Sequence, residues 1–160
     1  MYIRNMDEQE YYKKHKNKAE NVFKKIDTIR CPYFEGSVTF NSDGFHHLRF
    51  LPNGRERKHK AQLLKFKLLP FAKHIIAKSG TIQEYRTQLV AVGRKGKRDG
   101  LQKTKQAEYW GLYAIVGEDK RIRIRVILRR VGDGKIIFWS VMPDMNLKSG
   151  KLYKNDILES

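Results

Sequence analysis

The sequence contains a single cysteine, half as many acidic as basic residues, and no long apolar segment. The lone cysteine, Cys31, excludes a disulfide within the chain and is typical of a protein from a reducing compartment. No apolar stretch approaches the roughly 18 residues that a membrane span needs. The N-terminal sequence MYIRNMDEQEYY is too polar for a secretory signal. We therefore expect a cytoplasmic protein with no membrane partner.

The motifs of metal-dependent and nucleotide-dependent enzymes are also missing. The sequence has no paired cysteines and no HExxH motif for zinc, and its carboxylates are not spaced to hold magnesium. Residues 93–97 (GRKGK) are glycine-rich and basic, but no helix is expected after them, so we interpret them as a flexible phosphate-contacting loop. The sequence predicts no metal and no cofactor, so cleavage of nucleic acid by this chain would be metal-independent.

What the chain has in excess is positive charge. Its 34 lysine and arginine residues against 17 acidic ones give a formal net charge of +17 on 160 residues. So large a charge repels itself in the folded state, which favours a polyanionic partner. Nucleic acid is the first candidate, because neutralised phosphates release counterions and thereby drive binding. An anionic membrane surface would attract the same charge, but the basic residues are spread along the chain rather than gathered on one amphipathic helix.

Helical patterns dominate the first half of the chain. Residues 7–27 contain good helix formers, and residues 61–80 form the most apolar long stretch, with a kink expected at Pro70. Between these two helices we expect a short strand at residues 37–40, and then a turn or helix cap at 41–44 that leads into a short helix.

The second half of the chain has the pattern of β-strands. Four strands are predicted, connected by polar segments, the longest of which covers residues 94–106; the strands are 81–92, 108–116, 121–130 and 135–142. Helices followed by consecutive strands predict an α+β fold, with the N-terminal helices packed on a four-stranded antiparallel meander. The length suits one domain, which we divide into a helical extension (1–35), a main domain (36–143) and a C-terminal tail (144–160).

The most informative segment is the pair of strands between residues 121 and 143. Arg121, Arg123 and Arg125 alternate with apolar residues, which is typical of a strand with one face on a core and the other lined with guanidinium groups. A turn at Gly132-Asp133-Gly134 leads into a second apolar strand that carries Ser140. A cationic sheet face beside a lone hydroxyl indicates a surface that holds phosphates.

Metal-free cleavage of RNA needs a base for the 2′-hydroxyl, an acid for the leaving 5′-oxygen, and cations for the charge on the phosphorane. Histidine suits both proton roles and arginine suits the third. His46 and His47 are adjacent, so on a helix they diverge by about 100° and only one can face a shared site; we favour His47. The other candidates are the cluster Arg55, Arg57, Lys58 and His59, the strand arginines, and Ser140.

Each candidate also has a structural interpretation. The segment GRERKHK at residues 54–60 can be a solvated helix start, and the alternating arginines can be an exposed face that gives solubility. Arg129 and Arg130 point to opposite faces of a regular strand, so one of them points inward and needs a partner or a pocket. Ser140 can be a small core residue. Trp110 and Trp139 could stack on bases, although aromatic residues in strands are more often part of a core.

Helices followed by an antiparallel meander, with GFHHL on the helical side and RRVGDGKIIFWSVMP as the closing hairpin, resemble the barnase–EndoU–colicin D–RelE-like superfamily of ribonucleases, in its phage and mobile-element branches. The resemblance covers roughly residues 36–143. It implies metal-independent endoribonuclease activity, often as a toxin, with an acidic antitoxin or immunity protein as partner. By position it implies that the catalytic residues are His47 (or His46), Arg57 or Lys58, Arg130 and Ser140.

Three hypotheses therefore stand. The first is an endoribonuclease that acts on RNA such as tRNA or mRNA, as a toxin or mobile-element nuclease. The second is a non-catalytic basic module that binds nucleic acid, and the third is a basic accessory protein that binds an acidic partner. The predicted nucleic-acid contacts are Arg55, Arg57, Lys58, Arg121, Arg123, Arg125 and Lys135.

Overall fold

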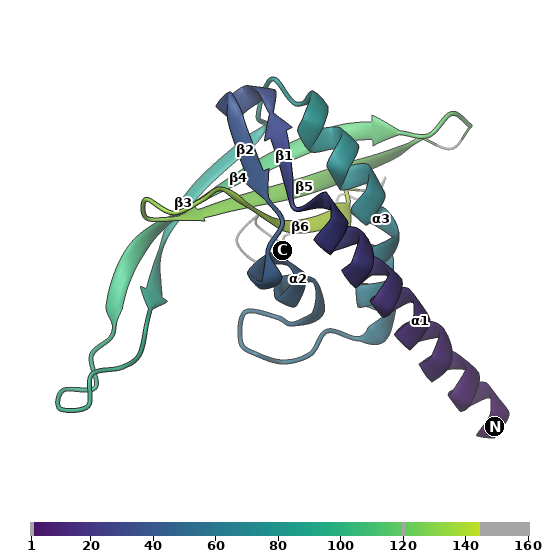
Figure 1. Cartoon of the computed structure of the whole chain (residues 1–160), viewed down its shortest axis with the longest axis horizontal. Helices are drawn as coiled ribbons and strands as arrows, with labels where there is room; N and C mark the ends of the chain where they lie inside the picture. Colours follow the sequence, from purple (N-terminus) through teal and green to yellow (C-terminus); the bar gives the residue numbers. More distant parts are fainter. Residues whose placement is uncertain (1, 120, 145–160) are drawn as a thin grey trace, which may run out of the picture.

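The computed structural model describes residues 2–119 and 121–144, and its fold is α+β, as predicted (Figure 1). The helices are α1 (Tyr2–Ile26), α2 (Ser42–Arg49) and α3 (His59–Lys78), with a short 3₁₀ turn at Pro32–Phe34. The strands are β1 (Thr28–Cys31), β2 (Gly36–Thr39), β3 (Glu84–Val92), β4 (Lys103–Val116), β5 (Ile122–Val131) and β6 (Ile137–Pro143).

The described strands form one six-stranded sheet in the order β1-β2-β6-β5-β4-β3. The strands β3 to β6 are joined antiparallel, but β2 lies parallel to β6 through the single pair Thr39–Ile137. The predicted sheet of four antiparallel strands was therefore too small, and the real sheet is mixed. The strand predicted at residues 37–40 is β2, but its parallel pairing with a distant segment leaves no local signal, so it was not placed in the sheet. β1 was not predicted, because its four residues are too few for a clear alternation.

A side-chain cap fixes the start of α2, whereas α1 and α3 are held by apolar packing. The side chain of Asn41 accepts a hydrogen bond from the amide of Gly44 (3.2 Å), so the predicted turn or cap at residues 41–44 is the N-cap of α2. α3 continues through Pro70 without a break. α1 runs beside α3 (Figure 1), and together they cover the sheet face that carries Ile124 and Val126.

A β-bulge changes the last two strands. Ile127 pairs with Ser140 and Leu128 with Phe138, so Trp139 has no counterpart on β5. Phe138 belongs to the main core, whereas Trp139 packs against a second apolar cluster that contains Tyr109 and Ile127. The bulge thus delivers an aromatic ring to the sheet face that does not carry the main core.

The strands β3 and β4 continue beyond the rest of the sheet (Figure 1). β5 pairs with β4 only from Ala107 onward, so the outer parts of β3 and β4 pair with each other alone. The prediction that residues 94–106 form a loop was wrong for residues 103–106, because cross-strand pairing with β3 extends the ladder into a polar sequence. In the described part of the chain, no helix has the length and apolar character needed to cross a membrane.

Candidate functional site

Four side chains from distant parts of the sequence form two contacting pairs, and the two pairs are close enough for the charge of Arg57 to act on Lys65. His47 lies on α2, Arg57 precedes α3, Lys65 lies on α3, and Ser140 lies on β6. Arg57 contacts His47, and Lys65 contacts Ser140. We call these four residues the site cluster. Lys65 is buried and Arg57 is half-buried, and a buried lysine is unusual and requires a reason.

Lys65 is buried, with only 7% of its surface exposed. Its Nζ donates to the Ser140 Oγ (2.9 Å) and to the backbone oxygen of Val141 (3.3 Å). Burial lowers the pKa of Lys65 to about 7, and the positive charges of Arg57 and Arg125 act in the same direction. Because this pKa lies near neutrality, the ammonium group can exchange its proton at physiological pH.

Arg57 joins the segment before α3 to α2. Its Nε donates to the backbone oxygen of His47 (3.0 Å), and its Nη2 lies 3.3 Å from the His47 Nε2. A guanidinium can only donate, so this second contact requires a His47 whose Nε2 is an acceptor. Desolvation lowers the pKa of Arg57. The backbone amide of Arg57 donates a hydrogen bond to the backbone oxygen of Arg49 (2.8 Å), which fixes the position from which the side chain extends.

An aromatic ring borders the site cluster. The imidazole of His47 stacks on the indole of Trp139 with the ring centroids 4.1 Å apart and the planes 15° from parallel. The guanidinium of Arg129 lies 4.2 Å from the centroid of the same indole, and its Nε donates to the Tyr109 hydroxyl (3.1 Å). Trp139 and Arg129 are both half-buried, so they are the part of this region that solvent reaches.

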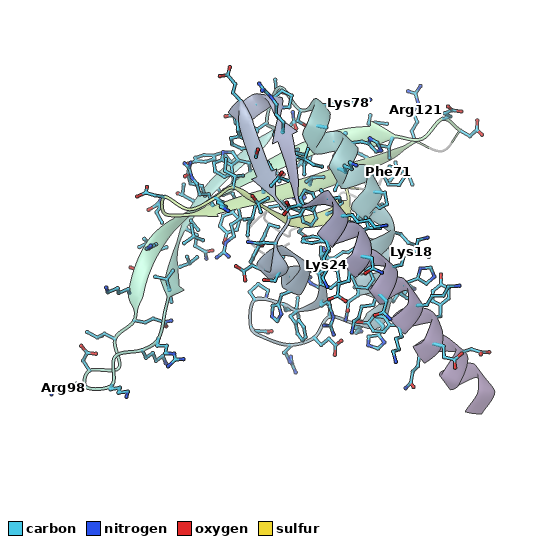
Figure 2. All side chains as sticks on the ribbon, viewed as in Figure 1. Lys18, Lys24, Phe71, Lys78, Arg98 and Arg121 are labelled. Atoms are coloured by element: carbon cyan, nitrogen blue, oxygen red, sulfur yellow. The ribbon has the colours of Figure 1, made fainter. Side chains whose placement is uncertain are left out.

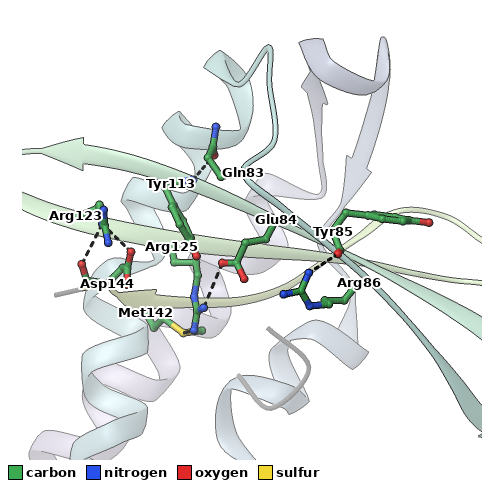
Figure 3. Close-up of polar contacts among 9 residues, drawn as sticks. All are labelled: Gln83, Glu84, Tyr85, Arg86, Tyr113, Arg123, Arg125, Met142 and Asp144. Carbon is green, nitrogen blue, oxygen red and sulfur yellow. Dashed lines mark hydrogen bonds and ion pairs between the residues drawn. The ribbon is translucent and has the colours of Figure 1, made fainter. Parts of the chain in front are cut away.

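The electrostatics of this region are dominated by cations. Arg125 is buried and pairs with Glu84 (3.4 Å), and its Nη2 also contacts the Met142 sulfur (3.1 Å; Figure 3). Arg57, Lys65 and Arg125 are thus held near one another, and the two charges that act on the pKa of Lys65 are both positive. Such an arrangement is unfavourable in the folded protein unless an anion binds there, and it is well suited to a phosphate.

The structure brings together some of the predicted site residues and separates others. His47, Arg57 and Ser140 are in the site cluster. Ser140 is fully buried, with a relative exposure of 0%, and its hydroxyl contacts Lys65. His46 lies outside the cluster, exposed and stacked on Phe50 (4.4 Å).

Arg130 lies on the opposite face of β5 from Arg129, as the strand alternation predicts. It packs over Trp110 of the main core and binds Glu108 through two bonds (3.0 and 2.6 Å). Arg130 is therefore the arginine with the inward partner, and Arg129 is the one beside Trp139.

The predicted nucleic-acid contacts also differ from one another. Arg55, Lys58, Arg121 and Lys135 are exposed, and Arg121 lies at the outer end of β5 (Figure 2). Arg123 is half-buried and pairs with Asp144 (2.7 Å; Figure 3). The prediction that Arg125 belongs to an exposed cationic row was wrong: Arg125 is buried, because its guanidinium contacts Glu84 of β3 and Met142 of the neighbouring strand β6.

Lys65 was not among the predicted site residues. It could have been found from its spacing, because it precedes the buried residues Leu68, Ala72 and Ile76 by 3, 7 and 11 positions and so lies on the same face of the helix. A lysine on the buried face of a helix lowers the stability of the fold, so its presence there indicates a functional role.

No family model, curated protein or solved structure matches this chain. Among residues 2–119 and 121–144, no group of three or more histidine, cysteine, aspartate or glutamate side chains is placed to hold a metal ion.

Proposed function

We propose that this protein is a metal-independent endoribonuclease that cleaves RNA by attack of the 2′-hydroxyl on the adjacent phosphate. The observation that carries the proposal is the site cluster: the imidazole of His47 and the amine of Lys65, whose pKa is lowered to about 7, lie among arginines and beside an aromatic ring. This is the set of groups that the reaction needs, namely proton donors and acceptors together with fixed positive charge.

The contacts suggest a division of roles. Arg57 and Arg129 bind the phosphate oxygens, because their guanidinium groups are the more accessible ones in this region. His47, whose Nε2 lies beside the Arg57 guanidinium, transfers a proton at the reacting oxygens. Lys65 supplies positive charge from the buried side of the site cluster, and the hydroxyl of Ser140 holds its amine in place. The 2′-hydroxyl gives its proton to His47 as its oxygen forms a bond to phosphorus, the bond from phosphorus to the 5′-oxygen breaks, and the leaving oxygen takes that proton from His47. The products are a 2′,3′-cyclic phosphate and a 5′-hydroxyl.

The biological setting belongs to the same proposal. The resemblance to barnase–EndoU–colicin D–RelE-like nucleases, carried over by position at His47 (or His46), Arg57 or Lys58, Arg130 and Ser140, suggests a toxin or a nuclease of a phage or mobile element. The formal charge of +17 suits an acidic antitoxin or immunity protein as well as RNA. Cytoplasmic RNA, including tRNA and mRNA, would be the substrate.

A second candidate function is a non-catalytic nucleic-acid-binding module. The observation that favours it is burial: His47 is 4% exposed and Ser140 is fully buried, so RNA must displace neighbouring groups to reach them. A basic surface that binds RNA without cleaving it would not need such access. A basic accessory protein for an acidic partner is the third alternative.

Incubation of the purified protein with total RNA and with tRNA in EDTA tests these functions. The wild-type protein should give discrete fragments that end in 2′,3′-cyclic phosphate. His47→Ala should abolish them with little change in RNA affinity, whereas the matched control His46→Ala should retain them, because His46 lies outside the site cluster. Intact RNA together with a salt-sensitive gel shift would contradict the enzyme and support the binding module.

A further inference from the structure

The outer part of β3 and β4, with the loop between them, is a two-stranded ribbon that pairs with no other strand. We define this basic ribbon as residues 89–106. Its base is set by the last pairing of β5 on β4, at Ala107, and its strands are held together by the pairs from Leu89–Gln106 to Val92–Lys103. Figure 1 shows the ribbon standing away from the helices and from the rest of the sheet, and Arg98 lies at its tip (Figure 2).

The charge of the basic ribbon is strongly one-sided. It carries six exposed basic residues and one acidic residue, Asp99, whose carboxylate accepts a bond from the amide of Leu101 (3.0 Å) and so shapes the turn. Within the described residues, none of the six cations makes an ion pair; they are Arg94, Lys95, Lys97, Arg98, Lys103 and Lys105.

The basic ribbon adds little to the core of the protein. Leu89 and Leu101 are 67% and 71% exposed, and Val90 is the residue of the ribbon that packs against an apolar cluster. An isolated two-stranded ribbon is marginally stable in water. Concentrating six like charges on it makes it less stable still, so its design points to a bound polyanion rather than to a structural role.

The chemistry of the basic ribbon distinguishes between kinds of RNA. Proteins that hold single-stranded RNA use aromatic side chains on which bases stack, and residues 89–106 contain no aromatic residue. Duplex RNA is recognised through its phosphates and 2′-hydroxyls, across a wide and shallow minor groove, by shape more than by sequence. Lysine and arginine on a projecting ribbon provide that kind of contact.

We infer that the basic ribbon binds the backbone of an RNA duplex, so that the substrate of the proposed nuclease is RNA with a base-paired stem beside the cleaved nucleotide. The statement that duplex RNA is the substrate rests on the proposed function, but the binding of duplex RNA by the basic ribbon can be tested without cleavage.

The test replaces the four cations of the loop in one variant, Arg94→Gln/Lys95→Gln/Lys97→Gln/Arg98→Gln. The matched control removes four exposed lysines from α1 instead, Lys13→Gln/Lys14→Gln/Lys18→Gln/Lys24→Gln, so that both variants lose the same charge. Fluorescence anisotropy in EDTA measures the affinity of each protein for a stem-loop RNA and for an unpaired RNA of equal length, over a series of salt concentrations.

The ribbon variant should bind the stem-loop about tenfold or more weakly, and the unpaired RNA only slightly more weakly, than the wild-type protein does. The slope of its stem-loop affinity against salt, on logarithmic scales, should fall by about 0.9 for each phosphate that the protein no longer neutralises. The α1 variant should lose little affinity, and equally for both RNAs.

Equal losses on both RNAs in the ribbon variant, or a loss no larger than in the α1 variant, would overturn the inference. If stem binding depends on the ribbon but no RNA is ever cleaved, the proposed nuclease fails and the binding of duplex RNA by the ribbon stands.

Discussion

Lys65 is the residue whose replacement tests the site cluster most directly. The folded protein lowers the pKa of Lys65 from 10.5 to about 7, because the ammonium group is buried beside Arg57 and Arg125. In the folded state the residue therefore binds its proton less tightly than in the unfolded chain, and it destabilises the fold wherever the unfolded chain is protonated. Replacing it by methionine removes the charge and fills a similar volume, so Lys65→Met should stabilise the protein near neutral pH while it reduces RNA cleavage.

The destabilisation caused by Lys65 becomes smaller as the pH rises, but Lys65 destabilises the fold throughout this range. Near pH ~6 both states hold the proton, and the folded state carries a penalty of about 5 kcal/mol relative to a lysine with an unshifted pKa. Near pH ~9 the folded state has released the proton and the unfolded state still holds it, so about 2 kcal/mol remains. The free energy of unfolding of the wild-type protein should therefore rise by about 3 kcal/mol relative to Lys65→Met over this interval.

Urea denaturation of both proteins at several pH values in this range measures the difference, since titration of all other groups cancels. Lys67→Met is the matched control, because Lys67 lies two residues away on α3 and is exposed; it should keep the pH dependence of the wild-type protein. If the curves for wild type and Lys65→Met run parallel with pH, Lys65 is not a buried cation with a low pKa, and the reasoning about the site cluster fails.

Three further predictions concern Arg57, Ser140 and Gly44. Arg57→Lys should abolish most cleavage, measured as release of 2′,3′-cyclic phosphate, because one ammonium group cannot reach both the backbone oxygen and the ring of His47; full activity in this variant would remove Arg57 from the mechanism. Ser140→Ala should lower the free energy of unfolding by about 1 kcal/mol, because Lys65 loses a hydrogen-bond partner; no change in urea denaturation would refute that hydrogen bond. Gly44→Ala should destabilise by about 2 kcal/mol or more, because its Cβ would lie 2.2 Å from the Phe138 oxygen, whereas Gly80→Ala, with open space around it, should change stability by less than about 0.5 kcal/mol. Equal denaturation midpoints for the two glycine variants would contradict the close packing of α2 on β6.

The parts of the fold that sequence could predict are those with a long local pattern. The strands β5 and β6 follow from alternation and a glycine turn, and the helices follow from apolar spacing over many residues. Asn41 could be assigned as a turn or cap residue for the same local reason, since its side chain bonds an amide three residues away. By contrast, the pairing of β2 with β6 joins residues 39 and 137 and depends on tertiary packing alone.

The candidate site was predictable in residue type more than in geometry. The divergence of adjacent positions on a helix predicts that only one of His46 and His47 faces a shared site, although it does not say which, and the structure places His47 in the site cluster. Arg130 could not be told from Arg129 by sequence, because the partner that distinguishes them, Glu108, lies on another strand. The stacking of Trp139 on His47 depends on the β-bulge between β5 and β6. The alternation of apolar and polar residues does not show where such an extra residue is inserted, so this contact could not be predicted.

The unbroken course of β4 has a consequence for where RNA would be cut. The strand leads from Lys103 on the basic ribbon to Tyr109, whose hydroxyl holds Arg129, without an interruption in its pairing with β3. Six residues of extended strand span about 20 Å. The proposed duplex would be bound at the ribbon end of β4 and the reacting phosphate near its other end, so β4 would set the distance between them. Cuts would then fall at a constant distance from the base of a stem, whatever the sequence of the loop.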